Sequence, residues 1–334
     1  MAARLARRIG LFLLTIWGAA TLNFFVPRLA PGDPVAARLI EMSQTGGYMQ
    51  TGIKQMVKAY DKQFGLDQPL WLQYLHYLGN TATFNFGYSL SNYPAKALDV
   101  ILTALPWTIG LLLVATFIAF VLGTLAGALL AWRKSPRWLG LLMAPLLTLS
   151  SVPYYLLGLI LVYVLAEVIR LFPLNGAYTT GTIPTLTPTF AWDVLYHSIL
   201  PGASIVLASL GSWALTMRGM MVTTEGEDFM LFAESRGLKD RMIFLWYGMR
   251  NAILPQFTSF ALSLGYVASG ALLVEIIFSY PGVGYLLYKS VQGSDYFVIY
   301  GIAFILILAI SAATMILDLT YPLLDPRIRA HERV

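Results

Sequence analysis

The sequence of 334 residues contains no cysteine, few charged residues and only three histidines. Without cysteine the chain has no disulfide, no thiolate nucleophile and no cysteine-ligated metal. Charged residues make up 12% of the chain and hydrophobic residues 57%, whereas a soluble domain is roughly 25% charged. This composition disfavours a water-soluble globular domain and predicts that most of the chain faces lipid or other apolar helices.

Motifs for nucleotide, metal and catalytic chemistry are also missing. No G-x-x-x-x-G-K-[ST] segment occurs, so the chain has no Walker A phosphate loop. Gly282-Val283-Gly284 lacks the third glycine and the βαβ setting of a dinucleotide fingerprint. His76, His197 and His331 fall on different predicted segments without metal-ligand spacing, and we interpret them as ordinary polar or capping residues. We therefore expect no enzyme, no bound cofactor or metal, and no nucleic-acid partner.

Long charge-free runs dominate what is present. A helix needs roughly 20 apolar residues to cross the hydrocarbon core, and six stretches qualify without containing Asp, Glu, Lys or Arg. The first is longer than the apolar region of a signal peptide and lacks an obvious cleavage site, so we treat it as a retained anchor. The predicted spans are Ile9–Val26, Val100–Trp132, Trp138–Ala166, Ile199–Met217, Asn251–Val274 and Val298–Leu317.

The distribution of Lys and Arg predicts the orientation. Basic residues cluster before the first span, between the second and third, between the fourth and fifth, and after the sixth, whereas the two short loops on the other side hold only Arg170 and Lys289. Because cytoplasmic loops are enriched in Lys and Arg, we expect both termini in the cytoplasm. We divide the chain into residues 1–30 (tail and first span), 31–99 (an extracytoplasmic segment) and 100–334 (a five-helix core).

The segment from Leu29 to Asp99 mixes charges with aromatic residues. Met56–Phe64 and Pro69–Leu78 have the spacing of short amphipathic helices, with a turn around Gly65. Two interpretations stay open for this segment: a cap that receives a substrate-loaded partner, or a packed lid with a structural role only.

The loop of residues 223–250 has the most informative pattern. Thr223 or Thr224 can cap a helix, because acidic residues follow in the position of its first turn. Phe229, Phe232 and Ala233 then share one face at helical spacing. Gly237 is placed to end this helix, and Asp240 to begin the next. The loop is therefore predicted to be a helix–glycine–helix unit whose exposed apolar face receives a partner.

Two further features lie in or beside the spans. The spacing Gly123-x-x-x-Gly127 permits close approach of two helices. Glu275 directly follows the fifth span, in a segment that continues to Pro281, Gly282 and Gly284. For this segment we keep two interpretations, an outer gate and a structural turn.

Five groups of residues form a set when taken together and in order. They are Pro31-Gly32-Asp33-Pro34, Leu66-Asp67-Gln68-Pro69 with Gln73-Tyr74, Phe232-Ala233-Glu234-Ser235-Arg236-Gly237-Leu238 with Met249-Arg250-Asn251-Ala252-Ile253-Leu254-Pro255, Glu275 to Gly284, and Asp325-Pro326-Arg327-Ile328-Arg329. This set resembles the permeases of binding-protein-dependent ABC importers of the dipeptide/oligopeptide/nickel branch, B-type subunits in particular. Glu234, Ser235 and Arg236 depart from the residues usual in that family's "EAA" loop.

The resemblance implies an all-α membrane protein of six helices with the type I importer permease fold. It also implies a second homologous permease chain, two ATPase subunits that hold ATP and Mg²⁺ and dock on residues 232–238, and an extracytoplasmic solute-binding protein. The substrate it implies is peptide, with oligosaccharides or nickel complexes as alternatives. A stand-alone secondary transporter would favour inverted repeats, broken helices and charges at the midplane, and none of these is evident in the sequence.

Overall fold

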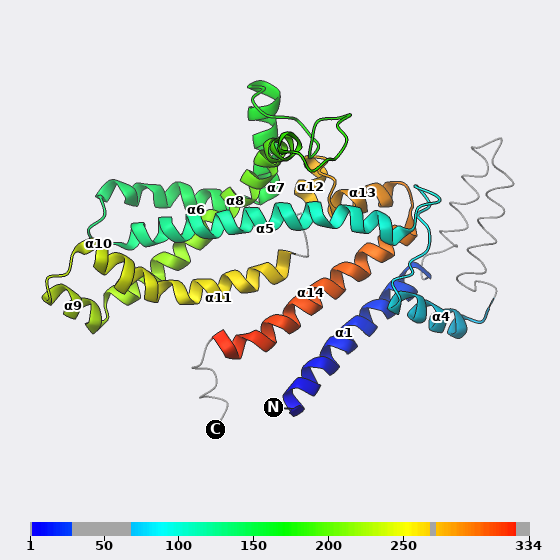
Figure 1. Ribbon diagram of the computed structural model, residues 1–334, viewed down its shortest axis with the longest axis horizontal. Coiled ribbons are helices and arrows are strands. Elements are labelled where there is room, and N and C mark those ends of the chain that lie inside the picture. Colours follow the sequence, from blue (N-terminus) through cyan, green and yellow to red (C-terminus); the bar gives the residue numbers. More distant parts are fainter. Residues whose placement is uncertain (1, 29–67, 268–271, 325–334) are drawn as a thin grey trace. The chain divides into compact units, whose positions relative to one another are not determined.

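The computed structural model describes residues 2–28, 68–267 and 272–324, and these parts are helical apart from loops and one isolated bridge between Tyr88 and Lys96 (Figure 1). The elements are α1 (Ala2–Arg28), α4 (Leu70–Ala82), α5 (Ala97–Ala131), the 3₁₀-helix η1 (Arg137–Leu142), α6 (Met143–Ser151), α7 (Tyr154–Leu161), the π-helix η2 (Val162–Val168), α8 (Pro188–Glu225), α9 (Asp228–Ser235), α10 (Asp240–Met242), the π-helix η3 (Ile243–Met249), α11 (Arg250–Val267), α12 (Leu272–Ile277), α13 (Val283–Gln292) and α14 (Tyr296–Leu324).

Four of the described helices are long and apolar enough to cross a membrane, and a fifth span results if one bent pair is counted as a single crossing. The four contain the predicted first, fourth and sixth spans, and the second except for its last residue, Trp132. Two of them, α5 with 35 residues and α8 with 38, exceed the roughly 20 residues that a bilayer requires. The ends of α5 and α8 therefore extend beyond the hydrocarbon core.

The predicted third span is not one straight helix. η1–α6 and α7–η2 meet at an angle of 100°. The break falls at Val152, whose backbone is extended (φ −88°, ψ 126°), and Pro153, which stands before the first residue of α7. Proline disfavours the helical conformation of the residue before it and lacks an N–H, so it ends α6 and starts α7.

The other predicted elements fall partly outside the described residues. The predicted fifth span, Asn251–Val274, includes residues 268–271, which lie outside the described part of the chain. Of this span the structure describes α11, which ends at Val267, and the start of α12 at Leu272. The predicted helix Met56–Phe64 also lies outside. The helix predicted at Pro69–Leu78 is present as α4, which extends four residues further.

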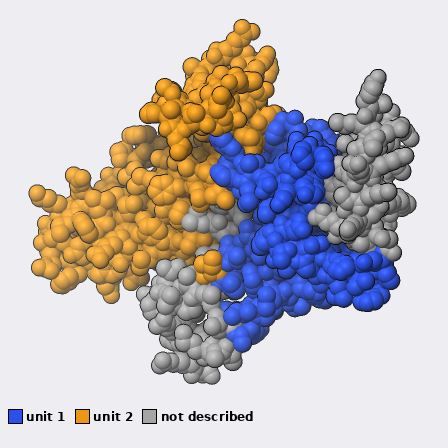
Figure 2. Space-filling view, turned by 45° about the vertical axis from the view of Figure 1, so that its right-hand side comes forward, with its two compact units in different colours: residues 1–107, 282–315 blue, residues 108–281, 316–334 orange. Residues whose placement is uncertain are grey.

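The chain forms two compact units, residues 1–107 with 282–315 and residues 108–281 with 316–334 (Figure 2). The first unit has a core of buried aliphatic and aromatic side chains that includes Phe86, Ile101 and Ile302. Asp295, 1% exposed, caps α14 by accepting the Val298 N–H at Oδ1 (3.4 Å), and its Oδ2 accepts hydrogen bonds from the Ser89 hydroxyl (2.5 Å) and from the backbone N–H of Ser91 (3.0 Å). This carboxylate therefore joins the loop before α5 to the start of α14.

In the second unit, α8 packs closely against α5 and α6 through small residues. A Cβ placed on Gly127 of α5 would lie 2.2 Å from the Ala214 carbonyl oxygen of α8, and one on Gly123 would lie 2.4 Å from the Trp213 Cβ. A Cβ on Gly211 of α8 would lie 2.3 Å from the Leu146 carbonyl oxygen of α6. The prediction that the Gly123/Gly127 spacing permits close helix approach is thus confirmed.

Candidate functional site

The 223–250 segment, which we call the hairpin, begins differently from the prediction. Helix α8 continues through Thr223 and Thr224 to Glu225, and α9 starts only at Asp228. The prediction that a threonine caps the next helix is therefore wrong. Both hydroxyls instead donate to carbonyl oxygens four residues earlier in α8, at 3.1 and 2.8 Å, a bond that satisfies a threonine inside a helix.

Helix α9 has a buried and an exposed side. Met230 and Ala233, 2% and 1% exposed, pack against Ile243 of η3. Phe232, which was predicted to share the docking face with Ala233, points the other way and is 66% exposed. The predicted apolar face is therefore divided: Ala233 belongs to the packing of the hairpin, whereas Phe232 and its neighbour Leu231 are accessible.

The glycine of the hairpin ends α9 in a Schellman motif. Gly237 has φ +70°, its N–H donates to the Glu234 carbonyl (2.8 Å), and the Leu238 N–H donates to the Ala233 carbonyl (3.4 Å). These are the two bonds that define the motif, and Leu238 adds its apolar contact by packing on the Met230–Ala233 cluster. The prediction that Gly237 ends this helix is confirmed, and its positive φ is the reason a glycine stands there.

The remaining predicted docking residues lie around this turn. The Ser235 hydroxyl donates to the Leu231 carbonyl at 2.9 Å, and Arg236, the last residue before the glycine, is exposed. The Glu234 carboxylate forms an ion pair with Arg133, which follows α5. Lys134 pairs with Asp240 at the start of α10. The hairpin is therefore held at two points by the loop between α5 and η1.

The second arm of the hairpin leads into α11 without interruption. Residues 240–267 form α10, η3 and α11 in succession, and the π-helical turn lies where α9 packs. A Cβ on Gly248 of η3 would lie 3.2 Å from the Met221 side chain of α8 and 3.6 Å from that of Met230 of α9. Gly248 thus brings η3 close to both α8 and α9. In Figure 1, α9 and α10 lie together at one end of the unit.

The turn after α12 contains the predicted gate residues. Glu275 is fully buried in α12, Gly282 immediately precedes α13, and Gly284 is buried in its first turn. Helix α12 ends in a second Schellman arrangement, in which Tyr280 N–H donates to the Glu275 carbonyl at 2.8 Å and Ser279 adopts φ +47°. Pro281 follows this turn. The geometry is that of a rigid turn, and the role of gate stays a prediction.

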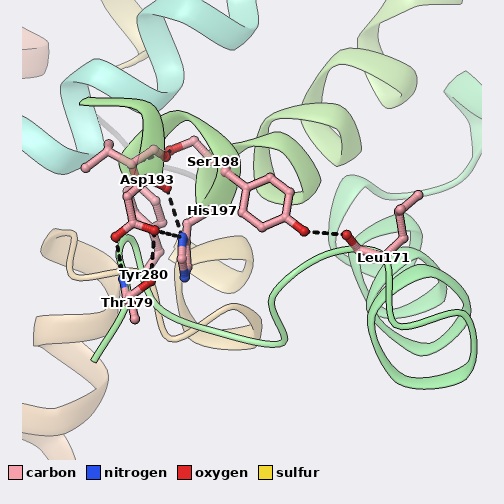
Figure 3. Close-up of polar contacts among 8 residues, drawn as sticks. Leu171, Thr179, Asp193, His197, Ser198 and Tyr280 are labelled. Carbon is pink, nitrogen blue, oxygen red and sulfur yellow. Dashed lines mark hydrogen bonds and ion pairs between the residues drawn. The ribbon is translucent and has the colours of Figure 1, made fainter. Parts of the chain in front are cut away.

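A polar clasp connects this turn to the loop between η2 and α8 (Figure 3). The Asp193 carboxylate of α8 accepts the N–H and the hydroxyl of Thr179, at 2.7 and 2.9 Å, and lies 3.2 Å from His197 Nδ1. The Ser198 hydroxyl contacts the Tyr280 hydroxyl at 3.0 Å. Burial raises the pKa of the Tyr280 phenol, and the nearby Glu275 raises it further. The loop, α8 and the turn are thereby fixed to one another.

This clasp was not predicted from the sequence. The Asp193/His197 spacing of four residues is the one local signal, because such residues meet on a helix face. The loop is anchored twice more, by the Tyr196 hydroxyl on the Leu171 carbonyl (2.5 Å) and by the Gly176 N–H on the Phe278 carbonyl (2.7 Å). Such bonds between distant backbone segments leave no pattern in the sequence.

Comparison with known proteins is consistent with this architecture. Residues 123–330 match the family described as the binding-protein-dependent transport system inner membrane component. The chain is 32% identical to a di/tripeptide transport system permease protein of Pseudomonas aeruginosa, over all of both chains. It is 30% identical to an oligopeptide transport system permease protein of Bacillus subtilis, over 98% of this chain and 99% of the relative. It is also 30% identical to a glutathione transport system permease protein of Escherichia coli, over 97% of each.

Proposed function

This chain belongs to the family of binding-protein-dependent transport system inner membrane components, and on that premise we propose how it works within an importer. The chain is a multi-pass permease subunit of the bacterial inner membrane. With a second, homologous permease chain it lines a pathway for peptides. Two ATPase subunits that hold ATP and Mg²⁺ drive the cycle, and an extracytoplasmic binding protein delivers the substrate.

The proposed orientation places both termini and the hairpin in the cytoplasm, with six crossings in total. Its support is the charge distribution, because Arg133, Lys134 and the basic residues of the hairpin all fall on one side of the long apolar runs. The turn at Glu275 and the clasp at Asp193 then lie on the outer side. There the turn would act as an outer gate beneath the binding protein.

The hairpin is the observation that supports the proposed mechanism most strongly. Phe232 and Leu231 are 66% and 55% exposed on a helix whose other side is packed, and exposed apolar side chains flanked by Arg236 and Lys239 suit a protein partner. An ATPase subunit seated there would push on α9. The ion pairs of Arg133 and Lys134 and the Gly248 contact would carry that push to α5, α8 and α11 as a rigid-body movement.

Peptides are the proposed substrate class because the relatives above are named as oligopeptide, di/tripeptide and glutathione permeases. Among the described residues, no three His, Asp or Glu side chains lie close enough together to hold a metal ion. We propose no chemical step for this subunit. Substrate choice is then a property of the pathway together with the external binding protein.

Co-purification tests the docking role. A Phe232→Asp variant places a charge on the exposed side of α9, and we expect it to insert into the membrane but to lose its ATPase subunits and its peptide uptake. Phe232→Leu keeps an apolar contact and should retain both. Equal recovery of ATPase subunits with the Asp variant and the wild type would refute the assignment of this face.

A further inference from the structure

Two uncharged side chains of the second unit have a buried oxygen atom without a hydrogen-bond partner among the residues that the structure describes: Thr124, through Oγ1, in α5 and Gln256, through Oε1, in α11. Thr124 is 2% exposed and Gln256 is fully buried. A buried polar group without a partner destabilises the conformation that contains it, so such groups are uncommon in folded proteins. Valine, of similar size to threonine, would fill the space of Thr124 without this cost.

The Thr124 hydroxyl differs from three other helical threonines of this unit. Thr148, Thr216 and Thr224 each donate to the carbonyl oxygen four residues earlier, at 2.8 to 2.9 Å. That local bond is the usual way in which a threonine satisfies its hydroxyl inside a helix. The Thr124 hydroxyl does not form it and is available as a donor.

Only the nitrogen of the Gln256 side-chain amide forms a hydrogen bond. Its Nε2 donates to the Trp213 carbonyl of α8 at 3.1 Å. This bond fixes the orientation of the amide, because a flipped amide would bring two oxygen atoms together. Oε1 is left as an acceptor. Gln256 can therefore retain its bond to α8 and also accept a hydrogen bond from another helix.

Contacts on either side place Thr124 and Gln256 at the same level of α5 and α11. One turn before Thr124, Phe120 stacks on Phe260 with ring centroids 4.5 Å apart. One turn after it, Ala128 belongs to the same buried cluster as Ala252. The helices therefore run antiparallel, and the residue midway between Phe120 and Ala128 faces the residue midway between Phe260 and Ala252.

We propose that Thr124 and Gln256 form a latch between α5 and α11 that is open in this conformation and closes in the other conformation of the transport cycle. On closing, the Thr124 hydroxyl donates a hydrogen bond to Gln256 Oε1. The inference rests on the proposed function, because movement of the hairpin would shift α11, which is continuous with it, against α5. The two residues are positioning residues, since they hold helices and touch no substrate.

Uptake by the complete importer in proteoliposomes tests the pairing. Thr124→Val and Gln256→Met should each lower ATP-driven uptake about threefold to tenfold, the effect of one hydrogen bond on a two-state equilibrium. The double variant should be no worse than Gln256→Met alone, because Thr124→Val removes only the latch bond that the Gln256 variant has already removed. Thr124→Ser retains the hydroxyl and should transport normally. Matched controls are Thr216→Val and Gln292→Met, whose side chains form local bonds on exposed surfaces.

The thermal midpoint of unfolding distinguishes a latch from a purely structural role of Thr124. The Thr124 hydroxyl forms no bond in this conformation, so Thr124→Val should leave the thermal midpoint of the nucleotide-free assembly unchanged or raise it, whereas Gln256→Met also removes the bond to the Trp213 carbonyl and should lower it. A lower midpoint in Thr124→Val, together with additive losses of uptake in the double variant, would overturn the proposal.

Cysteine cross-linking reports the closure directly, because the natural chain contains no cysteine. In a Thr124→Cys/Gln256→Cys variant, disulfide formation requires Cα atoms within about 4.4 to 6.8 Å. We expect a higher yield with ATP and vanadate, which hold the ATPase pair closed, than without nucleotide. Equal yields in the two states would overturn the latch and leave the proposed function intact. An assembly purified without ATPase subunits would overturn both.

Discussion

Replacement of Gly237 tests whether the end of α9 depends on a left-handed backbone. The position has φ +70°, and a Cβ placed there meets nothing within 4 Å. Any cost of a side chain is therefore conformational and not a clash. An L-residue other than glycine loses about 1–2 kcal/mol in this region, so Gly237→Ala should weaken the Schellman turn by that amount. Asparagine tolerates the conformation better, and a β-branched valine tolerates it worse.

Hydrogen exchange at two amides measures this effect. The N–H groups of Gly237 and Leu238 form the turn, and a loss of 1–2 kcal/mol should speed their exchange about 5- to 30-fold. Peptide uptake should fall in the same order, from glycine through asparagine and alanine to valine. The ATPase subunits should still assemble with the Asn variant.

A second glycine of the hairpin provides the control. Gly226 has φ −79°, and a Cβ there would lie 3.5 Å from the nearest carbonyl oxygen. Gly226→Ala should therefore be neutral or slightly stabilising. If Gly226→Ala and Gly237→Ala impair exchange protection and uptake equally, or if the Asn and Val variants at position 237 behave alike, backbone conformation is not the reason for the glycine.

Three further predictions concern packing, charge and the clasp. Gly127→Ala should destabilise the second unit by about 1–3 kcal/mol in thermal unfolding, since its Cβ would lie 2.2 Å from a carbonyl oxygen, whereas Gly110→Ala, with open space around it, should not. Arg133→Glu should lower ATP-driven uptake, and adding Glu234→Arg should restore part of it, because the double variant again pairs opposite charges. Both side chains are partly exposed (48% and 27%), so the coupling energy between them should be about 0.2–1 kcal/mol and should decrease as salt is added. Asp193→Ala should release the loop before α8 and increase its cleavage by added protease, without changing recovery of the ATPase subunits.

Local patterns were sufficient for much of the architecture. Charge-free runs predicted α1, α5, α8 and α14, because a helix in lipid must be apolar along its whole length. Gly237 was predicted from a glycine between two helical patterns, and the structure shows the positive φ that makes glycine necessary there. These features depend on nearest neighbours in the chain.

The misplaced features depend on competition or on distant contacts. Pro153 disfavours a helical conformation of the residue before it but does not exclude a continuous helix, and the run around it is uniformly apolar. The sequence therefore did not indicate a bend of 100°. Thr223 looked like a cap, but α8 continued past it because a threonine hydroxyl can bond within its own helix. The pairing of Arg133 with Glu234 joins residues a hundred positions apart. No pattern within either segment of the sequence predicts this ion pair.

Photo-cross-linking from the hairpin in intact cells is the most direct test that energy enters through α9. A photoreactive residue replaces either Phe232, which is 66% exposed, or Met230, which is 2% exposed on the other side of the same helix. We expect an adduct with an ATPase subunit from position 232, and adducts only within this chain from position 230. An adduct with an extracytoplasmic protein from position 232, or none with any ATPase subunit, would contradict the account.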